Sequence, residues 1–208
     1  MTDTQSLIDQ LAQDPARPVG SPVVPFALPV IAIMALCGMG VALVFSEPFL
    51  SVDLYGWGPM LVKWGFSIAL LLLCVPALWI LGKPGRRSRW AVAALALPFI
   101  PVAALLIFEM AISGLLVAGE TWANCLTAMA VMSPIAFAGA ILAMRTLAPT
   151  HLNRAGLVAG LFGGAVAMTA YAPFCPEIGM GYMAVFYCLP IFAMAAIGWF
   201  SGPRLLRW

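Results

Sequence analysis

Hydrophobic residues in this 208-residue chain gather into six long runs, and polar residues are confined to the N-terminal segment and to short connections. A helix of about 20 apolar residues crosses the roughly 30 Å of hydrocarbon in a bilayer, and each run reaches that length within the usual scatter. Strand-like alternation is absent, and a bilayer requires every backbone donor and acceptor to be satisfied within its own segment. We therefore predict an all-α integral membrane protein whose six transmembrane helices cover residues 25–45, 60–82, 90–118, 125–147, 155–173 and 181–201.

Composition places the chain in the same class. Hydrophobic residues make up 63% of the chain and charged residues only 9%, a balance too apolar for a soluble domain. The first residues include Asp3, Asp9 and Asp14 against only Arg17, so the start of the chain lacks the basic region of a cleavable signal peptide. We therefore expect the first hydrophobic run to stay in the mature protein.

Basic residues predict the orientation in the membrane. Of the 10 Lys and Arg residues, all but Lys63 fall on one side, which the positive-inside rule makes cytoplasmic, so both termini are expected to be cytoplasmic. The residues on that side are Arg17, Lys83, Arg86, Arg87, Arg89, Arg145, Arg154, Arg204 and Arg207. Lys63 is expected near the opposite rim, where its aliphatic stem can snorkel outward. For the basic segment 83–89 we favour a topological anchor over a site for anionic lipid or nucleic acid, so we expect no direct nucleic-acid partner.

A polar tail, residues 1–24, precedes the six-helix domain, residues 25–208. Residues 1–14 can form a short amphipathic helix that places Leu7, Ile8 and Leu11 on one face. The following segment, rich in proline and glycine, predicts an extended tether to the first transmembrane helix. A helix of about ten residues is marginal alone in water. Either a partner or the membrane surface orders it, or it is a frayed terminus without a role.

Two features inside the predicted helices each allow two interpretations. Glu109 is an intramembrane carboxylate, which is costly enough to suggest a function, but a structural role near the outer rim fits equally well. Gly156, Gly160 and Gly164 form a ladder at four-residue spacing, which lets another backbone approach closely. We favour packing within the bundle over a homo-oligomer formed through these glycine-rich helices.

The five cysteines divide into two groups. Cys37, Cys74 and Cys188 fall within predicted helices, where a free thiol behaves as a small buried hydrophobe. Cys125 and Cys175 fall at the predicted outer rim, in a compartment where thiols can oxidise. Neither belongs to a C-x-x-C pair, which argues against a quinone-coupled disulfide oxidase. The single His and the lack of clustered polar ligands predict no conventional zinc or iron site and no cofactor.

Several short motifs follow one another over residues 125–208. They are Cys125 at the head of a helix that contains Pro134, the Leu-Ala-Pro-Thr turn at 147–150 after Arg145, the glycine ladder at 156–164, Tyr171, the turn Cys175-Pro176-Glu177, Tyr187, and the terminal Gly-Pro-Arg-Leu-Leu-Arg-Trp. In order and spacing this stretch resembles the NrsF-type family of bacterial membrane anti-sigma factors. The opening Leu-Ile-Asp-Gln-Leu-Ala-Gln-Asp and the six-helix layout match that family more loosely, and Phe186 stands where Trp is expected.

The resemblance implies a regulator that is not an enzyme. Such a protein sequesters an extracytoplasmic-function (ECF) sigma factor at the bacterial inner membrane and releases it under stress. In that family a cysteine pair, matching Cys125 and Cys175 here, is associated with sensing heavy metals or oxidants, so a thiophilic metal could bind the pair transiently. The tail would supply the sigma-binding residues Leu7, Ile8 and Leu11. Alternatively, the two thiols form a permanent structural disulfide or stay inert.

Two other classes of protein compete with this interpretation. A small transporter or channel for a metal or solute would use Glu109 and the thiols to line a path. That class predicts polar groups at matching depth in several helices, and the runs offer only Glu109 with scattered Ser, Thr and Cys. A membrane enzyme fits less well, because no run carries a nucleophile with a base, paired carboxylates or histidine ligands for haem.

Overall fold

The computed structural model describes residues 4, 6, 23–45, 50–83, 89–113 and 119–207, and within these ranges the secondary structure is helical without any strand. The elements are α2 Val23–Val44, α3 Leu50–Tyr55, α4 Trp57–Leu81, α5 Arg89–Ala94, α6 Phe99–Ser113, α7 Trp122–Arg145, α8 Leu152–Tyr171, η1 Ala172–Phe174, α9 Met180–Met183, η2 Ala184–Cys188 and α10 Leu189–Leu205.

Six helical segments are long and apolar enough to cross a membrane. They are Val23–Val44, Trp57–Leu81, Arg89–Ile112, Trp122–Arg145, Leu152–Phe174 and Met180–Leu205. Each overlaps one of the six predicted transmembrane helices, which confirms the all-α prediction. The third predicted helix, 90–118, runs into residues 114–118, which lie outside the described ranges.

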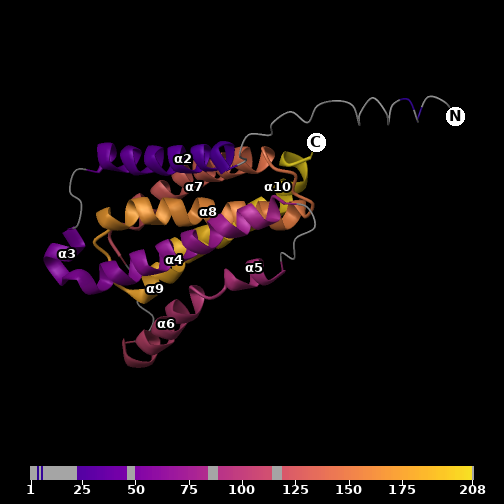
Figure 1. Ribbon diagram of the computed structural model, residues 1–208. Helices are drawn as coiled ribbons and strands as arrows, with labels where there is room; N and C mark the ends of the chain where they lie inside the picture. Colours follow the sequence, from indigo (N-terminus) through magenta and orange to yellow (C-terminus); the bar gives the residue numbers. More distant parts are fainter. Residues whose placement is uncertain are drawn as a thin grey trace.

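The fifth span, built on α8, is the centre of the bundle. It contacts α10, α7, α4 and α2, and Figure 1 shows it lying between the pair α2 and α7 on one side and α4 on the other. In its most apolar stretch 83% of the residues are buried, against 17% for α2. α8 is therefore enclosed by its neighbours, whereas α2 presents most of its surface outward.

Glycine lets α8 and α10 approach at backbone contact. A Cβ added at Gly156 would overlap the Gly198 carbonyl, and one added at Gly160 would overlap the Met194 carbonyl. The ladder predicted for close helix approach therefore packs inside the chain, as favoured above. A second copy could use Gly156 and Gly160 only after α10 had left them.

Two prolines break the third span. Pro98 and Pro101 lack the N–H groups that would bond the carbonyls of Ala94 and Leu97 in an α-helix. Leu97 N–H donates to the Ala94 carbonyl at 3.1 Å and Ile100 N–H to the Leu97 carbonyl at 3.2 Å. These tighter bonds satisfy both carbonyls and separate α5 from α6.

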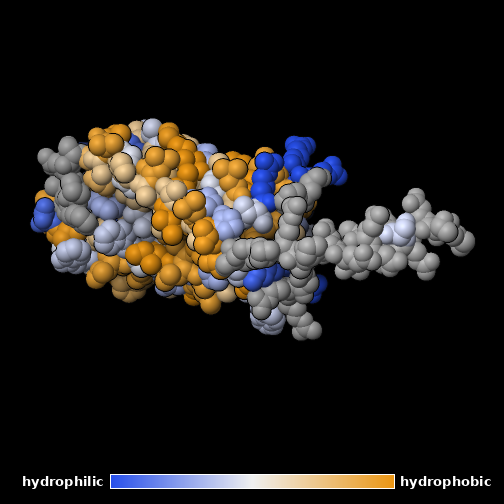
Figure 2. All heavy atoms as spheres, turned by 45° about the horizontal axis from the view of Figure 1, so that its top comes forward, coloured by the Kyte–Doolittle hydropathy of each residue, from blue (hydrophilic) through white to orange (hydrophobic). Residues whose placement is uncertain are grey.

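The charged residues lie at the two ends of the bundle, and Figure 2 shows an apolar band between hydrophilic ends. At one end the Arg145 side chain donates to the Leu205 carbonyl at 2.8 Å, which joins the last turns of α7 and α10. At the same end Ala148 N–H donates to the Gly82 carbonyl at 3.0 Å. Arg17, Arg86 and Arg87 lie outside the described residues, as do the tail residues listed above as sigma-binding: Leu7, Ile8 and Leu11.

The glycine packing yields a first prediction. Gly160→Ala places a methyl group against the α10 backbone, which cannot move as a side chain could, so we expect a loss of about 1–3 kcal/mol in stability. Gly40→Ala on α2 is the matched control, because a Cβ there meets no atom within 4 Å. Thermal unfolding in detergent, followed by loss of monodisperse protein, measures both. Equal melting temperatures for the two variants would contradict the close α8–α10 contact.

Candidate functional site

Two cysteines far apart in the sequence meet at the end of the bundle opposite Arg145. Cys125 lies in the first turn of α7, and Cys175 directly follows η1. Both are free thiols with fully buried side chains, and they lie near each other. The structure thus brings together the two candidate site residues, and the other three cysteines are buried within helices.

The segments that carry the two thiols are tied to each other. The Thr121 backbone N–H and hydroxyl donate to the Glu177 carboxylate at 3.3 and 3.2 Å. Thr121 precedes Cys125 by one helical turn, and Glu177 lies two residues after Cys175. A Cβ at Gly119 would lie 2.7 Å or less from side-chain atoms of Glu177 and Tyr182, so a larger residue there would force these side chains to shift. Since both sulfurs are buried, a reagent reaches them only when contacts of this kind open.

A proline explains the setting of Cys125. Pro190 has no N–H to offer the Phe186 carbonyl four residues earlier. Here the helix widens into the π-turn η2, where Leu189 N–H bonds the Ala184 carbonyl five residues back. The Cys125 thiol donates to the Phe186 carbonyl at 3.6 Å, one of the ways in which a membrane helix satisfies a group freed by proline. Such π-turns recur at functional sites.

Lys63 corrects one sequence-based expectation. It was expected to snorkel outward from the rim, but its side chain is only 3% exposed and its ammonium donates to the Cys175 carbonyl at 2.9 Å. The reason is the packing of α4 on α8, since the next residue, Trp64, donates its indole N–H to the Thr169 carbonyl at 3.2 Å. This helix turn therefore faces the bundle, and Lys63 enters the interior beside the thiols.

Tyr171, Tyr182 and Tyr187, three of the four tyrosines, are buried around the same point. The ring centroids of Tyr182 and Tyr187 lie 6.4 Å apart. Residues five apart diverge by about 140° around a regular α-helix, so the π-turn between them brings both rings to the thiols. The Tyr187 hydroxyl lies near both thiols, yet it makes no hydrogen bond to any of the described residues.

We call Lys63, Cys125, Cys175, Tyr182 and Tyr187 the thiol cluster. Sequence reasoning found the two cysteines, and named Tyr187 only as part of the family pattern. It missed Lys63 and Tyr182 as neighbours. The available signal for Lys63 was its isolation from the other basic residues, on an otherwise apolar helix. In the part of the chain that the structure describes, no three His, Cys, Asp or Glu residues are grouped to hold a metal.

Glu109 receives a structural explanation. Its carboxylate accepts the Met180 N–H at 2.6 Å, at the first residue of the last span. The first N–H groups of a helix have no partner within the helix, and a carboxylate there also interacts favourably with the positive end of the helix dipole. Of the two roles left open for Glu109, this contact supports that of a helix cap contributed by another span.

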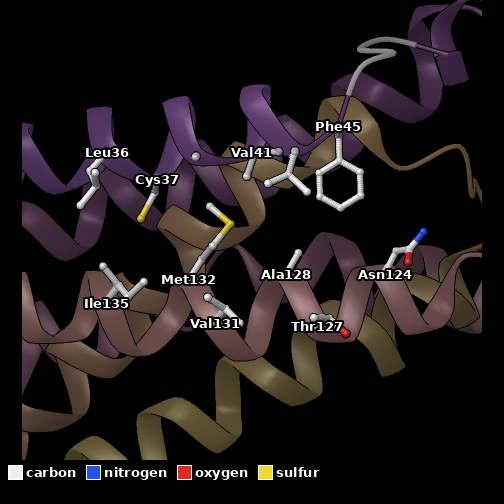
Figure 3. Close-up of a pocket in the computed structure, with 12 residues that line it drawn as sticks. Leu36, Cys37, Val41, Phe45, Asn124, Thr127, Ala128, Val131, Met132 and Ile135 are labelled. Carbon is white, nitrogen blue, oxygen red and sulfur yellow. The ribbon is translucent and has the colours of Figure 1, made fainter.

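A separate hollow lies between α2 and α7 and has a volume of about 630 Å³. Figure 3 shows its lining, in which Asn124 and Thr127 are the polar members and the remaining side chains are apolar or thiol-bearing. Thr127 already donates its hydroxyl to the Ala123 carbonyl at 2.7 Å. The hollow thus lacks the succession of polar groups expected of a path for a metal or solute.

The fold and the thiol pair define a class: an all-helical protein with six candidate membrane spans and a buried pair of free cysteines at one end. The family model described as "Negative regulator of sigma F" matches residues 11–208. The chain therefore belongs to the NrsF family.

Two curated relatives agree with this assignment. "Anti-sigma-F factor NrsF" of Caulobacter vibrioides is 31% identical over 217 aligned positions, which cover 99% of each chain. "Probable anti-sigma-F factor NrsF" of Azospira oryzae is 36% identical over 152 positions, or 71% of each chain. Both names describe regulators. No solved structure matches the chain.

The cap on the last span yields a second prediction. Glu109→Gln keeps an oxygen that accepts the Met180 N–H, so we expect nearly unchanged stability, whereas Glu109→Ala should cost about 1 kcal/mol, as for loss of a helix cap. Thermal unfolding in detergent measures the difference. If Gln destabilises the protein as much as Ala does, the negative charge matters rather than the acceptor.

Proposed function

We propose that this protein sequesters an ECF sigma factor at the cytoplasmic face of the bacterial inner membrane and releases it when Cys125 and Cys175 react with a heavy metal or an oxidant. The observation that carries the proposal is the thiol cluster. Two free thiols, one on α7 and one in the turn after η1, lie together, buried, at one end of a bundle whose other end is basic. Membership of a family of negative regulators of sigma F supports the regulatory part.

The proposed orientation follows from the charges. Arg145, Arg204 and Arg207 are exposed at the end that we assign to the cytoplasm, in accord with the positive-inside rule. The thiol cluster then faces the periplasm, where thiols are not kept reduced. A signal received there has to cross the bilayer, and α7 offers a direct connection. It begins beside Cys125 and ends, about 30 Å away, at Arg145 and its bond to α10.

The proposed reaction is either oxidation or metal capture. In oxidation the two thiols lose two electrons and two protons to an oxidant and form a disulfide. Closing a loop of about fifty residues is worth roughly 4 kcal/mol in the chain-entropy model. That value refers to the unfolded chain, and driving a two-state switch between folded conformations from 1:99 to 99:1 takes about 5.5 kcal/mol, which the bridge would have to supply as a difference between the two states. A thiophilic metal ion bridging both sulfurs is the second route.

On the cytoplasmic side, we propose that the tail docks Leu7, Ile8 and Leu11 into an apolar groove of the sigma factor. An amphipathic helix laid into a groove is a common way to bind such a segment. Asp3, Asp9 and Asp14 suit a partner whose DNA-binding surface is basic. Through the tail, the membrane domain would hold the sigma factor away from its polymerase.

Replacing the thiols tests the sensor. In a strain that carries a sigma-dependent reporter, we expect Cys125→Ser and Cys175→Ser to repress normally but to abolish induction by cadmium or by a thiol oxidant. Serine keeps a hydroxyl where Cys125 donates to Phe186, which limits structural loss. Cys37→Ser, distant from the thiol cluster in the wall of the α2–α7 hollow, is the control. Unchanged induction in both cluster variants would remove the sensor from the proposal.

Charge placed on the apolar face of the tail tests docking. Leu7→Asp combined with Leu11→Asp should raise reporter output without stress, because each buried anchor of an interface is worth about 2 kcal/mol. Gln10→Asp combined with Gln13→Asp adds the same charge to the predicted polar face and should leave repression intact. Affinity purification in detergent identifies the co-eluting sigma factor. Undiminished recovery with the leucine variant would exclude the tail as the docking element.

A further inference from the structure

We propose that Lys63 is the positioning residue of the thiol pair: its bond to the Cys175 carbonyl keeps that thiol within reach of Cys125. The use of the pair as a sensor rests on the function proposed above, but the positioning itself rests on the geometry. Lys63 neither supplies a sulfur ligand nor reacts. It acts through the backbone of a residue that does.

The first support is the bond itself. The Lys63 ammonium lies 2.9 Å from the Cys175 carbonyl oxygen, and the residues are 112 positions apart in the chain. A buried ammonium is costly unless it is paired, and charge-assisted hydrogen bonds in a dry interior are among the strongest in proteins. The Cys125 thiol and the Glu177 carboxylate are further ionisable groups near this amine, at the same end of the bundle.

The second support is an asymmetry between the two thiols. Cys125 belongs to α7, where its own N–H bonds the Thr121 carbonyl at 3.1 Å, and helical neighbours determine its position. Cys175 begins the non-helical stretch 175–179, and its N–H makes a long bond of 3.3 Å to the Ala172 carbonyl. One thiol therefore sits on a rigid helix, and the other on an irregular turn that needs anchors from elsewhere.

The third support is where the anchors come from. Thr121 holds Glu177 further along the turn, and Lys63 holds Cys175 directly. Lys63 stands on α4, a 25-residue helix that packs against α8 and is tied to it through Trp64. Because α4 is long and well packed, the position of Lys63 is fixed, and its hydrogen bond fixes the position of the Cys175 carbonyl. Without the Lys63 hydrogen bond we expect the Cys175 turn to sample positions in which the two sulfurs are too far apart to form a disulfide.

The test measures how fast the two thiols join in the full-length protein, purified in lipid nanodiscs without any sigma factor. A diazene oxidant takes two electrons and two protons from the thiols and becomes a hydrazine, while the Cys125–Cys175 disulfide forms. Mass spectrometry of the cross-linked peptide follows the rate. Lys63→Met keeps a long side chain but no donor, and we expect about a tenfold or greater slowing, because misplaced groups lose effective concentration steeply.

Two variants separate positioning from other effects. Lys63→Arg keeps a donor of similar reach and should restore a rate close to that of the unmodified protein. Lys83→Met removes the other lysine of the chain, at the far end of the bundle, and should leave the rate unchanged. A wild-type rate in Lys63→Met would overturn the proposal. So would a rate in Lys63→Arg as slow as that in Lys63→Met.

General loosening of the fold is tested in the same samples. Cys74 is fully buried on α4, and its labelling by a membrane-permeant maleimide should stay as slow in Lys63→Met as in the unmodified protein. Faster labelling in parallel with slower bridging would overturn the proposal. Should Lys63→Met fail to assemble, Lys63→Gln replaces it, since the shorter glutamine side chain cannot reach the Cys175 carbonyl. A wild-type bridging rate in that variant would be equally decisive against positioning.

The outcome is independent of the sensor hypothesis. If serine at positions 125 and 175 leaves induction intact, the sensor proposal fails while the effect of Lys63 on bridging can still be present. If the serine variants abolish induction but Lys63→Met bridges at the normal rate, the sensor proposal stands and the positioning role fails.

Discussion

Backbone contact between α8 and α10 is the constraint on which the rest of the bundle depends. Because glycines remove side chains from this contact, the two helices lie close enough for carbonyl groups to touch the opposite backbone. α8 is then enclosed by α10, α7, α4 and α2. A turn flanks each end of α8. The turn before α8 is bonded to Gly82 through Ala148, and the segment after it leads through η1 to Cys175.

At the Cys175 end of the bundle, several backbone groups lack a partner in their own helix and are hydrogen-bonded by side chains from other segments. Pro190 frees a carbonyl that the Cys125 thiol approaches, and the irregular turn after η1 leaves the carbonyl that Lys63 binds. The last span begins at a backbone N–H that Glu109 caps. In an interior without water these groups have few other partners. The same need for hydrogen bonds therefore places the Lys63 amine and the Cys125 thiol at one end of the bundle, where the Cys175 thiol is also buried.

Most of the fold could be predicted from the chain, and less of the site. Run lengths predicted the six spans, because length and hydrophobicity are properties of each segment by itself. Cys125 and Cys175 were singled out by their place at the predicted outer rim, and the family resemblance supplied the expected sensing role. Lys63 was placed wrongly, since the rule that a lysine snorkels assumes a lipid-facing helix turn, whereas this turn faces α8. Tyr182 escaped notice because regular helical periodicity points it away from Tyr187, and only the π-turn aligns the two.

The sequence by itself determined which segments are helices long enough to span a bilayer, where the third is interrupted, and how charge divides between the ends. These properties follow from the hydrophobicity, the missing N–H of proline and the order of residues, all of which act within a segment. Only the tertiary structure decided what the glycine ladder packs against, where Lys63 points, and whether two distant thiols meet. Those outcomes depend on which helix faces which, and that is set by the sum of contacts among all spans rather than by any one of them.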